Sequence, residues 1–136
     1  MHCVSLFLKG EDMIEPKVLT PSQLRYLLTM SAMGEDGRGI RCTDLAGSLG
    51  IAKSSVHNMI KTFIEFGYVS KDENGLAYFT KEGREAAVSF NRYYSVISSV
   101  LRENFPGIED IGGAACYLIS EMSEEDLEKL AEKHNV

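Results

Sequence analysis

Two short segments of the chain carry apolar residues at helical spacing, and a glycine separates them. The first opens at Thr43-Asp44, and the second begins at about Lys53. The positions expected to be buried are Leu45, Ala46 and Leu49 in the first segment and Val56, Met59, Ile60 and Phe63 in the second. Gly50 tolerates the dihedral angles of a sharp turn, and Ile51 is expected to plug that turn. A small crossing residue, a glycine turn and buried apolar contacts together predict a helix-turn-helix.

The flanking patterns extend this to a winged helix. Thr20-Pro21-Ser22-Gln23 has the form of a capping box, so it predicts a helix that ends by Gly34. After the helix-turn-helix, residues 67–71 and 76–79 read as strands. Residues 72–75 form the turn between them and contain Asn-Gly, a strong hairpin signal. Two strands that follow two helices give the element order of a winged helix.

The rest of the chain reads as helical. Thr80-Lys81-Glu82 caps a long helix to about Arg102, and Pro106-Gly107 prevents its continuation. A further helix carries Ile108, Ile111, Ala115, Leu118 and Ile119, and an acidic cap at Ser123 starts a last one. The predicted fold is mainly α with a small β-wing. Its parts are an N-terminal arm or extension (residues 1–19), a DNA-binding domain (20–80) and a helical dimerisation domain (81–136).

Charge is distributed unevenly over the 136 residues, whose net charge is −6. Residues 38–71 hold five basic and two acidic side chains, a local net of +3, whereas residues 103–136 hold two basic and nine acidic ones, a net of −7. This asymmetry fits a DNA-facing segment joined to an acidic segment that faces elsewhere, although a random surface mosaic gives the same counts. The scaffold, more than the charge, favours duplex DNA as the partner.

The outward face of the second helix and its surroundings supply the candidate DNA contacts. Serine and asparagine can bond to base edges or phosphates, while lysine chiefly neutralises phosphate. The predicted DNA-binding residues are Arg41, Thr43, Lys53, Ser54, Ser55, His57, Asn58, Lys61 and Lys71. Ala52 stands where a capping Ser or Thr is expected. Asp72 and Glu73 at the wing tip should repel phosphate, so we expect the wing to contribute less than this helix or to use backbone amides.

Other classes of protein find little support in the sequence. The three histidines lack partners in any nucleophile pattern, and there is no phosphate-binding glycine loop, so we expect no enzyme activity. No apolar run approaches the roughly 20 residues of a membrane span, and the N-terminus does not read as a signal peptide. Three widely spaced cysteines imply no disulfide framework, which favours the cytoplasm.

Residues 20–130 resemble the iron- and manganese-dependent repressors of the DtxR/MntR family. Residues 43–56, 79–87 and 115–123 carry the resemblance. The first two stretches also occur in other winged-helix regulators, such as the MarR type, whereas the third is more particular to the metal-dependent family. The resemblance implies a repressor that acts as a homodimer built from C-terminal helices, with recognition helices in successive major grooves. The residues expected at the dimer interface are Phe90, Tyr94, Ile97, Leu101 and Leu118.

The family's metal site carries over poorly. Cys116 matches one metal-ligand position of the family. The family's next two ligand positions, three and four residues later, hold Ile119 and Ser120 in this chain. The other positions at which the resemblance implies metal ligands are occupied here by Tyr94, Ser98, Gln23 and Tyr26. One thiol cannot assemble a divalent-metal site that needs several donors. We therefore predict no cofactor, and a regulator that has lost its metal switch.

Several alternatives remain open at this point. Manganese, iron or zinc could be held by non-standard ligands among His2, Cys3, Cys116 and His134, although their spacing does not join them. A small molecule could bind near Tyr93, Tyr94, Phe105 and Tyr117, which we favour as core or dimer contacts. Cys42 could sense redox state, but we favour the interpretation that it is a buried structural thiol. Finally, the winged helix could dock a protein in place of DNA.

Overall fold

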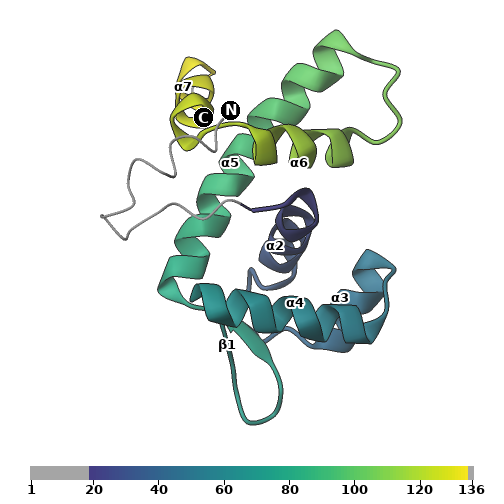
Figure 1. Cartoon of the computed structure of the whole chain (residues 1–136), viewed down its shortest axis with the longest axis vertical. Helices are drawn as coiled ribbons and strands as arrows, with labels where there is room; N and C mark the ends of the chain where they lie inside the picture. The colour runs from purple at the N-terminus through teal and green to yellow at the C-terminus, as the bar shows by residue number, and fades with distance from the viewer. Residues whose placement is uncertain (1–18, 135–136) are drawn as a thin grey trace. The chain divides into compact units, whose positions relative to one another are not determined.

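The capping box predicted at Thr20 begins the first helix of the structure, α2 (Pro21–Met33). The Thr20 N–H donates to Gln23 Oε1 at 3.0 Å, and the Gln23 N–H donates to Thr20 Oγ1 at 3.1 Å. The helix ends directly before Gly34, as predicted. This computed structural model describes residues 19–134 (Figure 1). The predicted arm over residues 1–19 therefore lies outside the described residues except for Leu19.

The helix-turn-helix consists of α3 (Cys42–Leu49) and α4 (Lys53–Phe66), which pack against each other (Figure 1). Gly50 joins them with a φ of 68°, a left-handed conformation that favours glycine. Leu45, Val56, Ile60 and Phe63 are almost completely buried. Ala46 is also buried, whereas Leu49 and Met59, which were expected to be buried, are half-buried. Helical periodicity therefore identified most of the apolar positions of both helices.

The wing is an antiparallel hairpin of β1 (Val69–Lys71) and β2 (Ala77–Phe79). Ile40 extends this small sheet, because its N–H donates to the Ala77 carbonyl at 2.8 Å and the Ala77 N–H donates back to the Ile40 carbonyl at 2.9 Å. The chain between α2 and α3 thus lies along the wing. The order of two helices and then a hairpin confirms the predicted fold class, mainly α with a small β-wing.

The wing is tied to the long helix α5 (Lys81–Asn104) through Thr80. The Thr80 hydroxyl donates to the Gly67 carbonyl at 2.6 Å and accepts from the Gly83 N–H at 3.0 Å. Gly83 is buried against the same junction, where an added Cβ would collide with the Tyr68 carbonyl oxygen. Only glycine fits this close approach, so the residue fixes how α5 leaves the wing.

The described residues form two compact units, residues 25–91 and residues 19–24 with 92–134. The second unit contains the later part of α5 together with α6 (Ile111–Glu121) and α7 (Glu124–Lys133). Asp110 caps α6 by accepting from the Gly113 N–H at 2.9 Å, and Ser123 caps α7 by accepting from the Asp126 N–H at 3.0 Å. The domain boundaries at residues 20 and 80 stay a prediction.

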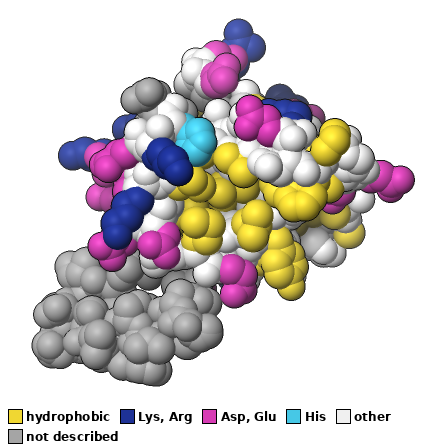
Figure 2. Space-filling view, turned by 90° about the horizontal axis from the view of Figure 1, so that it is seen from above, with side chains coloured by type: hydrophobic (Ala, Val, Ile, Leu, Met, Phe, Trp, Pro, Cys, Tyr) yellow, Lys and Arg dark blue, Asp and Glu magenta, His cyan; other side chains and the backbone are white. Residues whose placement is uncertain are grey.

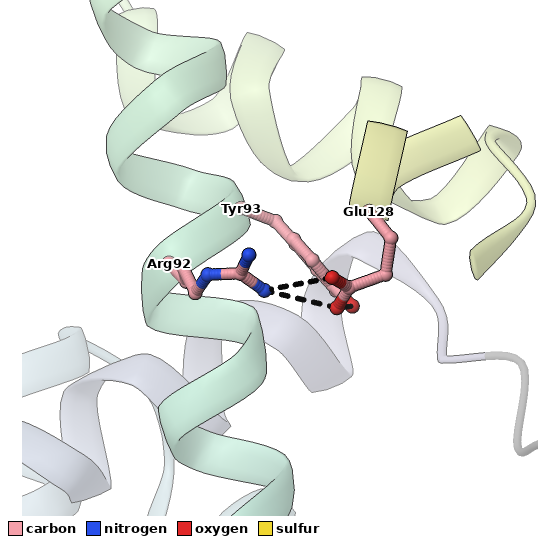
Figure 3. A network of polar contacts seen from close by, with 3 residues as sticks. All are labelled: Arg92, Tyr93 and Glu128. Carbon is pink, nitrogen blue, oxygen red and sulfur yellow. Dashed lines mark hydrogen bonds and ion pairs between the residues drawn. The ribbon is translucent and has the colours of Figure 1, made fainter. Parts of the chain in front are cut away.

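A polar network ties α7 to α5 within this second unit (Figure 3). Arg92 Nη1 donates to both carboxylate oxygens of Glu128, at 3.0 and 2.9 Å, and the Tyr93 hydroxyl donates to Glu128 Oε2 at 2.5 Å. The apolar residues of this unit's core are Val96, Ile97, Leu101, Ala115, Ile119, Leu127 and Ala131. None of the helices within residues 19–134 combines the length and apolarity of a membrane span.

Candidate nucleic-acid interface

A groove of about 610 Å³ lies in the unit of residues 25–91, between the start of α3, the start of α4 and the wing. Its lining residues are Arg41, Cys42, Thr43, Lys53, His57, Lys71, Asn74, Gly75 and Leu76. Five of the nine predicted DNA-binding residues are in this set, and three separate elements supply them. Nothing in the sequence indicated that residues 74–76, at the end of the wing turn, would share their groove.

The charge of the groove is opposite to that of the chain. Arg41, Lys53 and Lys71 are basic side chains, and no Asp or Glu is among the lining residues. The chain as a whole carries a net charge of −6. Clustered cations attract anions locally whatever the overall charge, so the groove suits a backbone phosphate.

The exposed surface of α4 divides into two stripes. Lys53, His57 and Lys61 recur every four residues along one stripe, and beside it lie Ser54 and Asn58, whose side chains are neutral hydrogen-bonding groups. All five are exposed, and the first two of the basic stripe line the groove. The stripe with the two lysines is therefore suited to phosphate, and the stripe of Ser54 and Asn58 beside it to base edges.

The first turn of α4 is uncapped by any side chain. Ala52 is the capping residue, in an extended conformation (φ −69°, ψ 145°), and its methyl group accepts no hydrogen bond. This confirms the anomaly noted in the sequence. The N–H groups of a helix's first turn carry partial positive charge. The uncapped end therefore adds to the positive potential near Lys53.

The prediction that Ile51 plugs the turn is wrong, because its side chain is 37% exposed. The N–H groups of Gly50 and Ile51 both donate to the Ala46 carbonyl, at 2.8 and 3.1 Å. The turn is closed by these backbone bonds and needs no apolar side chain beneath it. Ile51 consequently adds an apolar group to the exposed surface between the two helices.

The two acidic residues of the wing tip differ in structure, although the sequence suggested the same role for both. Asp72 Oδ1 accepts from the N–H groups of Asn74 and Leu76, both at 2.9 Å, and Oδ2 accepts from the Tyr78 hydroxyl at 3.2 Å. The bond from Leu76 is the main cause that lowers the pKa of the Asp72 carboxyl. The sequence predicted the turn over residues 72–75 but assigned Asp72 only a repulsive role. It missed the hydrogen bonds of the Asp72 carboxylate, although aspartate side chains commonly bond the backbone two residues on.

The side chains at the positions aligned with family metal ligands are engaged elsewhere. Gln23 Oε1 caps α2, the buried Ser98 hydroxyl donates to the Tyr94 carbonyl at 2.5 Å, and Ile119 packs in the core. Cys116 and Tyr26 are buried. Within residues 19–134, no three His, Cys, Asp or Glu side chains gather as a metal site would require. These residues do not fit the family's divalent ion.

The residues predicted for dimerisation fall into different environments. Ile97 and Leu101 are buried within their own chain, and Phe90 and Tyr94 are half-buried. Leu118 is 41% exposed, and its neighbour Tyr117 is 64% exposed. Phe105, which is 55% exposed, is a further exposed apolar residue of the unit that contains residues 92–134. Hydrophobic side chains form a broad area on the face drawn in Figure 2.

Two of the three cysteines are among the described residues, and both are buried. Cys42 begins α3 and lines the groove, and Cys116 lies in α6. The burial of Cys42 agrees with the structural-thiol interpretation of that residue. Cys3 and His2 lie outside the described residues, and His134 is exposed at the end of α7, where its ring nitrogen lies 3.1 Å from the Leu130 carbonyl.

Comparison with known proteins places the helix-turn-helix in context. The model of the IclR helix-turn-helix domain matches residues 24–73. No curated protein sequence matches the chain. All of the groove's lining residues except Asn74, Gly75 and Leu76 lie within the matched segment, which supports a DNA-binding regulator.

Solved structures with this fold include metal-dependent regulators. The manganese regulator SloR has a TM-score of 0.72 at 24% identity over 86% of this chain, and IdeR of T. acidophilum has 0.62 at 22% over 89%. A hypothetical protein from Sulfolobus solfataricus has 0.59 at 28% over 85%. This chain spans 55% of SloR and 56% of IdeR, but 88% of the Sulfolobus protein. These likenesses establish the winged-helix fold.

Proposed function

We propose that this protein is a transcriptional repressor that binds duplex DNA through α4 and the wing. The observation that carries the proposal is the groove lined by Arg41, Lys53 and Lys71, which holds no carboxylate on a chain with a net charge of −6. In this account α4 enters the major groove, and the helix-turn-helix match over residues 24–73 supports that placement.

The two stripes of α4 would contact different parts of the DNA, one the phosphates and the other the bases. Lys53 and His57 face the groove beside Lys71, so they would hold the backbone phosphates next to the wing. Ser54 and Asn58 lie on the neighbouring stripe and would contact base edges. Phosphate contacts fix the register of the protein on DNA, and base contacts provide sequence preference.

We further propose that the protein works without a metal switch, although its fold is that of metal-dependent regulators. The support comes from the aligned ligand positions: Gln23 is a capping residue, Ser98 is bonded to its own helix, and Ile119 has no donor. Binding to DNA should therefore be the same in the presence and absence of divalent metal.

A homodimer formed through residues 92–134 completes the proposal. Tyr117 and Leu118 are adjacent on α6 and present apolar surface to solvent, and Phe105 precedes that helix. Exposed apolar patches of this kind mark interaction surfaces. Ile97 and Leu101 would support the interface from the core beneath, because their own side chains are buried.

The DNA-binding proposal is tested by fluorescence anisotropy in EDTA with a labelled duplex from the region upstream of the protein's own gene. We expect affinity to fall steeply as salt rises, because bound lysines and arginines release counterions from phosphate. Lys53→Ala should weaken binding and reduce the salt dependence by about one counterion. Lys129→Ala, an exposed lysine on α7, is the matched control and should leave both unchanged. Absence of binding by the wild-type protein would contradict the proposal.

The dimer is tested by light scattering coupled to size-exclusion chromatography. Leu118→Glu places a charge in the proposed interface and should shift the protein to the monomer mass. Val88→Glu introduces the same charge at an exposed apolar position on α5, where 67% of the residue is accessible, and should leave the mass unchanged. A monomeric wild-type protein would exclude the proposed interface.

A further inference from the structure

The wing turn is organised by the carboxylate of Asp72. Besides the three hydrogen bonds that this carboxylate accepts from Asn74, Leu76 and Tyr78, the Asp72 N–H donates to the Leu76 carbonyl and the Gly75 N–H donates to the Asp72 carbonyl, both at 3.0 Å. Asn74, Gly75 and Leu76 therefore each form a hydrogen bond with Asp72. Such a turn loses its principal constraint when the carboxylate is removed.

The same turn forms one wall of the groove. Asn74, Gly75 and Leu76 line it, together with Lys71, which precedes Asp72 in the chain. The turn is also packed against the chain that leads into α3, since a Cβ added at Gly39 would lie 2.5 Å from Leu76 Cβ and 2.9 Å from the Tyr78 hydroxyl. Asp72 is thus bonded both to the groove wall and to a tyrosine packed on the chain that enters α3.

Glu73 provides an internal comparison. It is exposed, and it makes no hydrogen bond or ion pair with any part of the chain that the structure describes. Both residues carry a negative charge close to the proposed phosphate site. Simple repulsion predicts that removing either charge strengthens DNA binding.

We infer that Asp72 is a positioning residue for DNA binding: its carboxylate holds the wing turn so that Lys71 and the backbone of residues 74–76 face the bound phosphate. This inference rests on the proposed DNA-binding function. It gives Asp72 and Glu73 opposite effects. Removing the Asp72 side chain weakens binding because the wall of the groove loses its order, whereas removing the Glu73 side chain only reduces repulsion.

The test compares Asp72→Ala with Glu73→Ala in the full chain, by anisotropy with the same upstream duplex over a range of salt. We expect Asp72→Ala to weaken binding about tenfold, the scale of a lost hydrogen-bonded charge. Its salt dependence should fall by about one counterion, because Lys71 no longer meets phosphate. Glu73→Ala should bind as tightly as the wild type or up to about twofold more tightly.

Two further variants separate positioning from folding and from charge. Asp72→Asn removes the charge but keeps an oxygen that can accept from the Asn74 and Leu76 N–H groups, so it should recover most of the affinity. Tyr78→Phe removes one hydrogen bond to Asp72 and keeps the ring, so it should weaken binding about two- to threefold. This variant tests the inference if the Asp72→Ala protein proves unfolded. Lys71→Ala should have less effect in the Asp72→Ala background than alone.

The outcomes distinguish this inference from the proposal beneath it. If Asp72→Ala binds as tightly as Glu73→Ala, or Asp72→Asn is as weak as Asp72→Ala, then Asp72 does not position the wing, while the DNA-binding function stands. If the wild-type protein binds no duplex at any salt concentration, both the function and this inference fail.

Discussion

The hydroxyl of Tyr93 donates a hydrogen bond to Glu128 Oε2 at 2.5 Å, which joins α5 to the C-terminal helix α7 within the unit of residues 92–134. Arg92 binds the same carboxylate through an ion pair at 2.9 Å. The hydrogen bond from Tyr93, and after it the hydrogen bond from Arg92, lowers the pKa of the Glu128 carboxyl. The anchoring of α7 therefore depends on an ionised Glu128.

This relationship predicts a pH dependence of stability. A carboxyl whose pKa is lower in the folded than in the unfolded protein stabilises the fold above the ordinary glutamate value of 4.5, and that contribution is lost as the pH falls through its lowered folded pKa. The difference in melting temperature between wild type and Glu128→Gln should thus be present at pH 7 and shrink as the pH falls below 4.5. An equal difference at pH 7 and pH 3 would contradict the role of the ionised form.

Gly83 should not tolerate alanine. The added Cβ would collide with the Tyr68 carbonyl oxygen, so the wing and the start of α5 would have to separate. We expect a loss of about 2 kcal/mol or more in the free energy of unfolding, measured by urea denaturation. Gly47→Ala is the control: that glycine is exposed in α3 with no atom within 4 Å of an added Cβ, and alanine there should stabilise by about 0.5–1 kcal/mol.

Ala52→Ser should stabilise the protein. The capping position of α4 has the extended conformation that a serine cap adopts, but alanine offers no acceptor. The serine hydroxyl can accept an N–H of the first turn, which is worth about 1 kcal/mol. A rise in melting temperature of a few degrees is the expected result. No rise would mean that the first turn of α4 is already satisfied in another way.

Asn58→Ala combined with Lys61→Ala should weaken DNA binding at least about tenfold without changing the melting temperature by more than about 2 °C. Both side chains are exposed on α4, so the fold does not depend on them. The combination of Lys129→Ala with Lys133→Ala on α7 is the control for lost positive charge. Unchanged affinity of the α4 double variant would mean that another face contacts DNA.

The sequence was sufficient for those parts of the fold that local chemistry determines. The Thr20–Gln23 capping box, the Gly50 turn and the Asn-Gly wing turn each depend on residues close together in the chain, and each is found where predicted. The winged-helix order follows from these signals. Helical periodicity likewise identified Val56, Ile60 and Phe63 as the buried face of α4.

Features that depend on distant neighbours could not be predicted in this way. Periodicity shows that Ile97 and Leu101 lie on an apolar face, but it does not show whether their own chain or a partner covers them, and here their own chain does. Ile51 was expected to be buried, but the packing of the neighbouring helices decides how much of a turn residue is covered, and Ile51 is 37% exposed. The groove required Arg41, Lys53 and Lys71 to come together from three elements.

The most direct test of the account is DNA binding by the apo protein. Anisotropy with the upstream duplex would be measured in EDTA, and then with manganese or ferrous iron in excess over the chelator, at several salt concentrations. The account predicts salt-sensitive binding in EDTA that added metal does not alter. Binding that appears only with metal would contradict the loss of the metal switch, and absence of binding under both conditions would contradict the DNA-binding function itself.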